Sequence, residues 1–240
     1  MSATHPGGAT SPAPAGGGGH GLVGTTDAGA FLARLVRLAP DAVVRLRSDA
    51  SAGRTAIWAR LPWNVLVVRT VTGPGPGDAT VSAGELLAVL DGDGATLPGR
   101  RDAQWRWPLP PPASRPVETV PVAEVRRIAA AAAGALRSAA EHGVAGRAVG
   151  QRAVRDALLD HVPVLVSPDD STAERVEVNQ RLIQAVVRMG FLGRADADAP
   201  TDVGVRVAGR WVALVGPFGA AWSQKVADLV VNPIRTRPFG

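Results

Sequence analysis

Histidines and carboxylates are the side chains best suited to acid–base chemistry in this sequence. Only His142 and His161 lie in segments expected to be ordered, because His5 and His20 fall in a Gly- and Pro-rich start. His161 follows Asp160 at an expected helix end, where a cation is favourable without any catalytic role. A spatial triad with a remote serine stays open, but no G-x-S-x-G, H-E-x-x-H or Walker motif occurs. We therefore predict no catalytic residue and keep an enzyme without a signature motif as an alternative.

Metal and cofactor motifs are incomplete. The stretch 91–94, D-G-D-G, resembles the opening of a calcium loop, but Thr96 stands where a glycine is expected and Asp102 where a glutamate is expected. Asp-Gly pairs are also common turn chemistry. The glycines of 143–150 follow an Ala-rich helix, whereas a dinucleotide fingerprint needs a preceding strand. The sequence predicts neither a metal nor a cofactor.

The positive charge of the chain comes almost entirely from arginine. Lys225 is the only lysine among 26 basic residues, a bias typical of a GC-rich bacterial genome. The sequence pI near 11.1 overstates the charge, because a chain without Tyr or Cys and with one Lys has little to titrate above neutral pH. The formal net charge of +5 is modest for 240 residues. Attraction to nucleic acid is therefore allowed but not required.

The C-terminal half carries a nucleic-acid hypothesis. From about residue 149 we expect a helix, a short strand, a capped helix and a hairpin, an order that resembles a winged helix. The region 147–240 has 12 basic and 10 acidic residues, so it is barely basic. A DNA-binding regulator is thus an alternative function. Its candidate phosphate or base contacts are Arg181, Arg188, Arg206 and Arg210.

Tryptophan use favours a different function. The chain has six Trp, four Phe and no Tyr, and its tryptophans all lie in or beside expected strands. Those that stay exposed on a sheet would form an interaction surface, because Trp is enriched in binding hot spots. Our leading hypothesis is a non-enzymatic binding protein with a regulatory or assembly role, whose partner is another protein or a second copy. The candidate protein-binding residues are Trp58, Trp63 and Trp211.

Two Trp-bearing hairpins organise the expected fold, at about 55–71 and 203–215. The first is the densest apolar run of the N-terminal half, and Pro62 to Asn64 supplies its turn. Amphipathic helices should pack on an antiparallel sheet, which gives an α+β fold. The expected helices are 28–38, 81–90, 121–142, 149–159 and 172–189, and further strands are expected at 42–47 and 103–109. Ser82 with Glu85, and Ser171 with Glu174, have the spacing of capping boxes for the second and the last of these helices.

Composition also suggests domain boundaries and a compartment. Residues 1–24 read as a disordered tail, 25–110 as an N-terminal α+β subdomain, 111–120 as a Pro-rich linker and 121–240 as a C-terminal α+β subdomain. The absence of cysteine excludes disulfides. The longest charge-free apolar run is about 14 residues, short of a membrane span, and no signal peptide is recognisable. We expect a cytoplasmic protein without a membrane segment.

Overall fold

The structure is a computed structural model that describes residues 18–142, 151–167, 175–194 and 201–225. The chain divides into two compact units. The first comprises residues up to Arg60 together with Arg69–Arg106, and the second comprises Leu61–Val68 together with the chain from Trp107.

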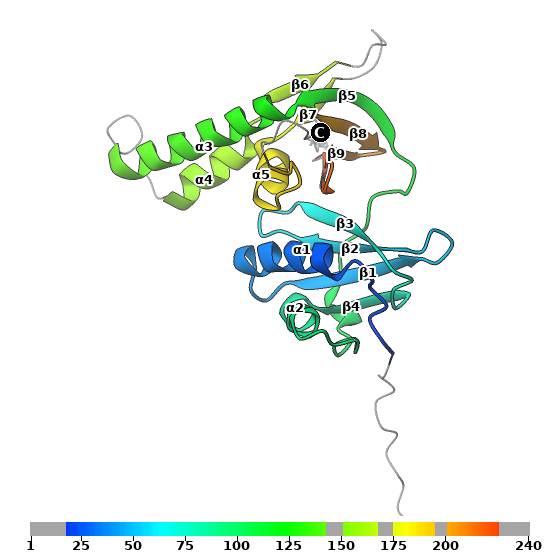
Figure 1. Cartoon of the computed structure of the whole chain (residues 1–240). Helices are drawn as coiled ribbons and strands as arrows, with labels where there is room; N and C mark the ends of the chain where they lie inside the picture. The colour runs from blue at the N-terminus through cyan, green and yellow to red at the C-terminus, as the bar shows by residue number, and fades with distance from the viewer. Residues whose placement is uncertain (1–17, 143–150, 168–174, 195–200, 226–240) are drawn as a thin grey trace, which may run out of the picture. The chain divides into compact units, whose positions relative to one another are not determined.

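The first unit has two helices on an antiparallel sheet (Figure 1). Its strand order is β4-β1-β2-β3, with β3 contributing its second half. Alternate residues of β1 and β2 are buried, and helices α1 and α2 pack against each other. The core is therefore one helical layer on one sheet face. The elements are α1 (Thr25–Leu38), β1 (Val43–Asp49), β2 (Arg54–Arg60), β3 (Leu66–Thr72), β4 (Asp78–Ser82), α2 (Ala83–Asp91) and the short 3₁₀ helix η1 (Asp102–Gln104).

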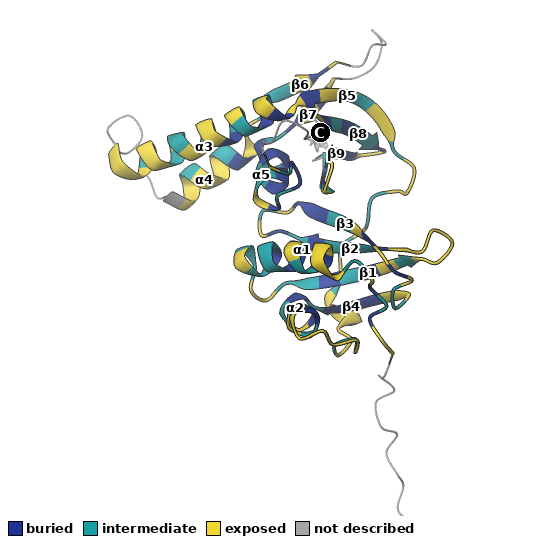
Figure 2. Cartoon of the chain, in the orientation of Figure 1, coloured by how far each residue is buried: buried dark blue, intermediate teal, exposed yellow. Residues whose placement is uncertain are grey.

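The second unit has the strand order β3-β10-β9-β8-β5 and a separate two-stranded pair, β6–β7. Helix α5 packs on β9 and β10, and helices α3 and α4 pack against each other. Strand β9 is buried along Trp211–Leu214 on both faces. Most of helix α3 is exposed or intermediate, which Figure 2 shows in yellow and teal. The elements are β5 (Arg115–Pro121), α3 (Val122–His142), α4 (Gln151–Asp160), β6 (Val164–Val166), β7 (Val176–Val178), α5 (Gln180–Arg188), β8 (Asp202–Ala208), β9 (Trp211–Gly216) and β10 (Gly219–Gln224).

The predicted α+β class and both hairpins are confirmed. The first hairpin is β2 and β3, and the second is β8 and β9, in which Ala208 pairs with Trp211. A third strand that was not predicted, β10, continues the second hairpin. The predicted cap of the second helix is also present, because the Ser82 hydroxyl accepts a hydrogen bond from the Glu85 amide at 3.4 Å.

Two predicted elements are wrong. The helix expected over 172–189 is limited to Gln180–Arg188, because Val176–Val178 alternates as a strand and Asn179 caps the helix by accepting from the Leu182 amide at 3.1 Å. The predicted Ser171 cap lies outside the described residues. The strand expected over 103–109 is absent, and Asp102–Gln104 forms a 3₁₀ helix instead.

Two boundaries also differ from expectation. Strand β5 (Arg115–Pro121) overlaps the expected linker 111–120 and pairs with β8 at the end of the strand order, where the missing N–H of Pro116 is tolerated. The last residues of the expected tail are ordered. His20 is only 5% exposed, and its Nδ1 accepts the Leu22 amide at 3.0 Å while Nε2 lies 2.9 Å from the Gly94 carbonyl oxygen. The Gly-rich composition of residues 1–24 predicted disorder, so an ordered segment was not expected here.

Within the described ranges, no helix combines the length and the apolar character needed to cross a membrane.

The β3–β4 connection yields a stability prediction. Gly75 has φ +63°, and a Cβ there would lie 2.2 Å from Thr55 Oγ1 and 2.3 Å from Ser48 Oγ. Gly53 has a similar φ of +59° but open space around it. We expect Gly53→Ala to cost about 1–2 kcal/mol from backbone strain alone, and Gly75→Ala to cost clearly more. Chemical denaturation of both variants measures the difference; equal losses would contradict the close contact.

Candidate interaction surfaces

The turn 61–65 presents Trp63 in the second unit. The Leu61 amide donates to the Val65 carbonyl at 2.8 Å, and the Asn64 amide donates to the Leu61 carbonyl at 3.0 Å. Asn64 has φ +65°, a left-handed conformation that Asn tolerates better than most residues. The turn chemistry read from the sequence therefore forms as a tight loop, with exposed Pro62 and Asn64 on either side of half-buried Trp63.

Trp63 and helix α5 hold each other through reciprocal hydrogen bonds. The indole Nε1 donates to the Arg181 carbonyl at 3.2 Å, and Arg181 Nη1 donates to the Trp63 carbonyl at 2.9 Å. Arg181 Nε also donates to Asp160 Oδ1 at 2.8 Å. The guanidinium of Arg188 lies 5.8 Å from the centre of the Trp63 ring, a cation–π distance. We call Trp63, Asp160, Arg181 and Arg188 the Trp63 cluster.

The two arginines of the Trp63 cluster differ in what they offer to a partner. The Arg181 side chain is 23% exposed and is committed to Asp160 and to the turn. Arg188 is exposed, and its Nε donates a long hydrogen bond of 3.4 Å to Gln184. The cluster thus presents one solvent-facing guanidinium stacked on an indole. This arrangement can accept a carboxylate or phosphate beside an apolar surface.

Trp58 lies in the first unit on a sheet face that the chain itself partly covers. It stands opposite Arg45 in the β1–β2 register and is half-buried. The Arg45 guanidinium lies 6.0 Å from the centre of the Trp105 ring. Trp58 therefore neighbours an intramolecular Arg45–Trp105 contact, so its surroundings favour packing within the unit.

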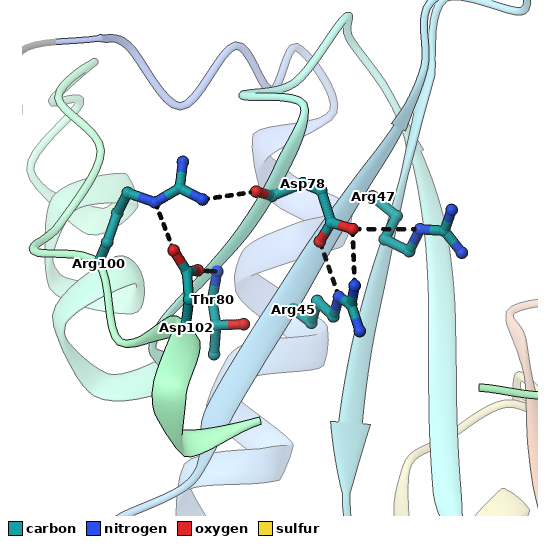
Figure 3. Close-up of polar contacts among 6 residues, drawn as sticks. All are labelled: Arg45, Arg47, Asp78, Thr80, Arg100 and Asp102. Carbon is teal, nitrogen blue, oxygen red and sulfur yellow. Dashed lines mark hydrogen bonds and ion pairs between the residues drawn. The ribbon is translucent and has the colours of Figure 1, made fainter. Parts of the chain in front are cut away.

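A polar network joins β1, β4 and the segment before η1 (Figure 3). Arg45 binds Asp78 through two hydrogen bonds of 2.7 Å, and Arg47 lies 3.8 Å from the same carboxylate. Arg100 binds Asp102 at 2.7 Å, and Asp102 accepts the Thr80 amide at 2.7 Å. Sequence reasoning missed this network because its arginine–carboxylate pair on neighbouring strands is 33 residues apart.

The network shifts the titration of its carboxylates. The hydrogen bond from Arg45 is the main cause that lowers the pKa of Asp78, the charges of Arg45, Arg47 and Arg100 add to it, and burial opposes it. The hydrogen bond from Arg100, followed by the Thr80 amide, lowers the pKa of Asp102. The Asp78 hydrogen bond in turn raises the pKa of Arg45. These carboxylates are held ionised, which suits charge pairing rather than proton transfer near neutral pH.

Trp211 is buried, so the prediction of a surface role for it is not supported. The side chain is 7% exposed on β9, a strand paired on both sides within the second unit. The run W-V-A-L-V is apolar throughout. Such a run fits a strand that is covered on both faces, which leaves Trp211 in the core.

The winged-helix arrangement is also wrong. The β8–β9 hairpin is not a free wing, because β9 pairs with β10 and β8 pairs with β5. Arg206 donates to the Ser114 hydroxyl at 2.8 Å and to the Ser114 carbonyl at 2.6 Å. Arg210 is exposed at the hairpin turn and donates to the Lys225 carbonyl at 3.3 Å. Of the four predicted arginines, only Arg181 and Arg188 lie together.

The histidines and the D-G-D-G segment form no assembled site in the described part of the chain. The Asp160 carboxylate pairs with Arg181, while His161 is exposed. His142 is exposed near the end of α3. No group of three His, Asp or Glu side chains that could hold a metal ion occurs among the described residues.

Comparison with known families divides the chain in two. Residues 109–228 match the family described as "Domain of unknown function (DUF8185)". The chain belongs to this family. Residues 23–107 match a second family, "Domain of unknown function (DUF8010)". The DUF8185 match contains β5 to β10 with α3 to α5, and the DUF8010 match contains α1 to η1. None of the curated proteins matches the chain.

Sliding clamps of DNA polymerase share the fold of this DUF8185 protein. The beta subunit from Streptococcus pyogenes has a TM-score of 0.53 and 11% identity, over 84% of this chain and 63% of that chain. The beta chain from Streptococcus pneumoniae has a TM-score of 0.52 and 10% identity, over 90% and 67%. The Caulobacter crescentus beta sliding clamp has a TM-score of 0.51 and 11% identity, over 93% and 69%. The chain spans about two thirds of the length of these subunits, and the likeness shows the fold alone.

The Asp78 network predicts acid sensitivity in this DUF8185 protein. Because folding lowers the Asp78 pKa, the contribution of Asp78 to stability is present above the unfolded value of about 3.9 and is lost as pH falls through the lower folded value. We expect stability to fall less steeply in Asp78→Asn than in the wild type between about pH 5 and pH 2. Urea denaturation at several pH values measures this, with Asp91→Asn, at an exposed position of α2, as the control. Identical slopes for Asp78→Asn and wild type would contradict it.

Proposed function

We propose that this protein works by binding rather than by chemistry, as a cytoplasmic assembly protein that associates with protein partners, a second copy of itself included. The sliding-clamp fold carries this proposal. The proteins with this fold are described as beta subunits or sliding clamps of DNA polymerase, which are components of a larger assembly. A subunit of an assembly acts through its surfaces, so exposed side chains are the candidate contacts.

The Trp63 cluster is the surface that best fits this role. It combines an indole ring, a solvent-facing arginine and an exposed turn, and Trp and Arg are the residue types most enriched in binding hot spots. Reciprocal hydrogen bonds between Trp63 and Arg181 hold the ring in place before any partner arrives. Such preorganisation lowers the entropic cost of association.

Association with DNA is the second candidate. It is supported by the description of similar proteins as subunits of DNA polymerase and by the exposed arginines Arg188 and Arg210. Arg181 and Arg206 are poorer candidates, because their guanidinium groups already bind Asp160 and Ser114. The net charge of +5 allows attraction to phosphate without making it strong.

Self-association tests the leading proposal. We expect sedimentation velocity to show a concentration-dependent increase above the 24.6 kDa monomer. Reversal of the charge in Arg188→Glu should weaken this association by about tenfold or more, since a like-charge contact across an interface is strongly unfavourable. Arg37→Glu, at an exposed position of α1, makes the same change of charge elsewhere and should have little effect. A strict monomer at every concentration, or equal effects of both variants, would contradict the proposal for a second copy.

Duplex binding at several salt concentrations tests the second candidate. We expect Arg210→Ala to reduce the slope of log affinity against log salt by about one phosphate contact. Arg206→Ala serves as the matched control on the same hairpin, because Arg206 already binds Ser114. Absence of binding at low salt would exclude DNA as the partner.

A further inference from the structure

Strand β4 ends the strand order of the first unit and pairs with β1 on one side. Its other side carries backbone groups that β1 does not use, among them the Asp78 carbonyl and both the amide and the carbonyl of Thr80. An edge of this kind invites pairing with a strand of another molecule unless it is covered.

A three-residue segment covers this edge. Arg100 Nη2 donates to the Asp78 carbonyl at 2.7 Å, the Thr80 amide donates to Asp102 Oδ1 at 2.7 Å, and the Arg101 amide donates to the Thr80 carbonyl at 2.7 Å. Figure 3 shows the first two of these contacts, together with the 2.7 Å pair of Arg100 and Asp102. We call Arg100–Asp102 the edge cap.

The edge cap relies on side chains more than on backbone. Two of its three bonds to β4 come from the side chains of Arg100 and Asp102, both of which are 49% exposed. Side chains at the surface rotate without unfolding the strands beneath them. Thr80 is only 2% exposed, and the side-chain bonds of the edge cap can be removed one at a time by substitution.

The sequence of β4 is suited to pairing with its own copy. The strand reads D-A-T-V-S from Asp78 to Ser82, and its buried residues Ala79 and Val81 face the core. An antiparallel pair centred on Thr80 places Ala79 beside Val81 of the second copy. The core layer of each copy then continues across the pair in register, which is the condition for stable strand pairing.

We propose that the β4 edge is a strand-pairing surface for a second copy of this chain, and that the edge cap keeps it closed. This inference goes beyond the proposed function, because it concerns a sheet edge in the first unit and not the Trp63 cluster. It assigns Arg100 and Asp102 a role in controlling which surface the protein uses for association.

Hydrogen exchange at one amide tests the cap. We expect the Thr80 amide to exchange about tenfold faster or more in Asp102→Ala, because it loses a hydrogen bond to a charged acceptor. Arg101→Ala is the matched control, since it removes a neighbouring arginine that pairs with Glu85 but keeps the backbone amide that binds Thr80. Unchanged exchange of Thr80 in Asp102→Ala would overturn the assignment of the cap.

Crosslinking at position 80 tests the pairing. The natural chain has no cysteine, so Thr80→Cys introduces a single thiol. Residues directly opposite in a hydrogen-bonded antiparallel pair have Cα atoms about 5.5 Å apart, within the range of about 4.4–6.8 Å that a disulfide spans. We expect oxidation to yield at least about tenfold more linked dimer when Thr80→Cys is combined with Asp102→Ala than with Arg101→Ala. Ser51→Cys combined with Asp102→Ala is the control. Ser51 lies in an exposed turn, so crosslinking there measures the rate of chance collisions.

The outcomes separate this inference from the proposed function. Faster Thr80 exchange without a disulfide-linked dimer of the Thr80→Cys variant would overturn pairing with a second copy. If Arg188→Glu weakens association and no disulfide forms at position 80, the result would support the Trp63 cluster as the contact surface and contradict pairing through β4. If Asp102→Ala does not fold, Arg100→Ala removes the bond to the Asp78 carbonyl and the ion pair with Asp102, and should likewise increase crosslinking at position 80 relative to Arg101→Ala.

Discussion

The backbone groups on the side of β4 that does not pair with β1 need hydrogen-bond partners. In the first unit, the segment Arg100–Asp102 lies along this side of β4 and supplies them. An edge strand that leaves these groups bare is open to pairing with other chains. Here the carbonyl of Asp78 accepts from Arg100, and the amide and carbonyl of Thr80 bind the segment Arg100–Asp102. The side chain of Asp78 is meanwhile held by Arg45. Asp78 thus joins strand β1 to the covered edge of the sheet.

Local sequence signals predicted the elements whose causes are local. The Ser82–Glu85 cap and the Pro62–Asn64 turn each depend on residues within four positions, and both form. The helix expected over 172–189 failed because a helical apolar pattern ran through the alternating strand Val176–Val178, which pairs with β6. Its partner β6 lies about ten residues earlier in the chain. The apolar pattern within 172–189 carries no information about this pairing, so it could not show that a strand would form there.

The candidate site could be predicted only in part, because its contacts join distant positions. The chain separates Trp63 from Arg181 by 118 residues, and spacing alone gave no reason to connect them. Sequence reasoning placed both among the site residues for different functions, one as a protein contact and the other as a phosphate contact. The structure joins them in one cluster, and it shows why: the helix that carries Arg181 packs its apolar face on β9 and β10 and leaves its polar face to the turn.

The many arginines of this chain become informative only once their partners are known. Because genome composition favours arginine, the presence of an arginine is weak evidence for a binding role. The contacts of each arginine have to decide which role it has. Arg45, Arg181 and Arg206 each bind a carboxylate or a serine of the chain itself. Arg188 differs because its guanidinium is exposed and its charge lies over a fixed indole. A side chain already ordered by stacking loses less rotamer entropy on binding, so a partner would gain more from Arg188 than from an unsupported surface arginine.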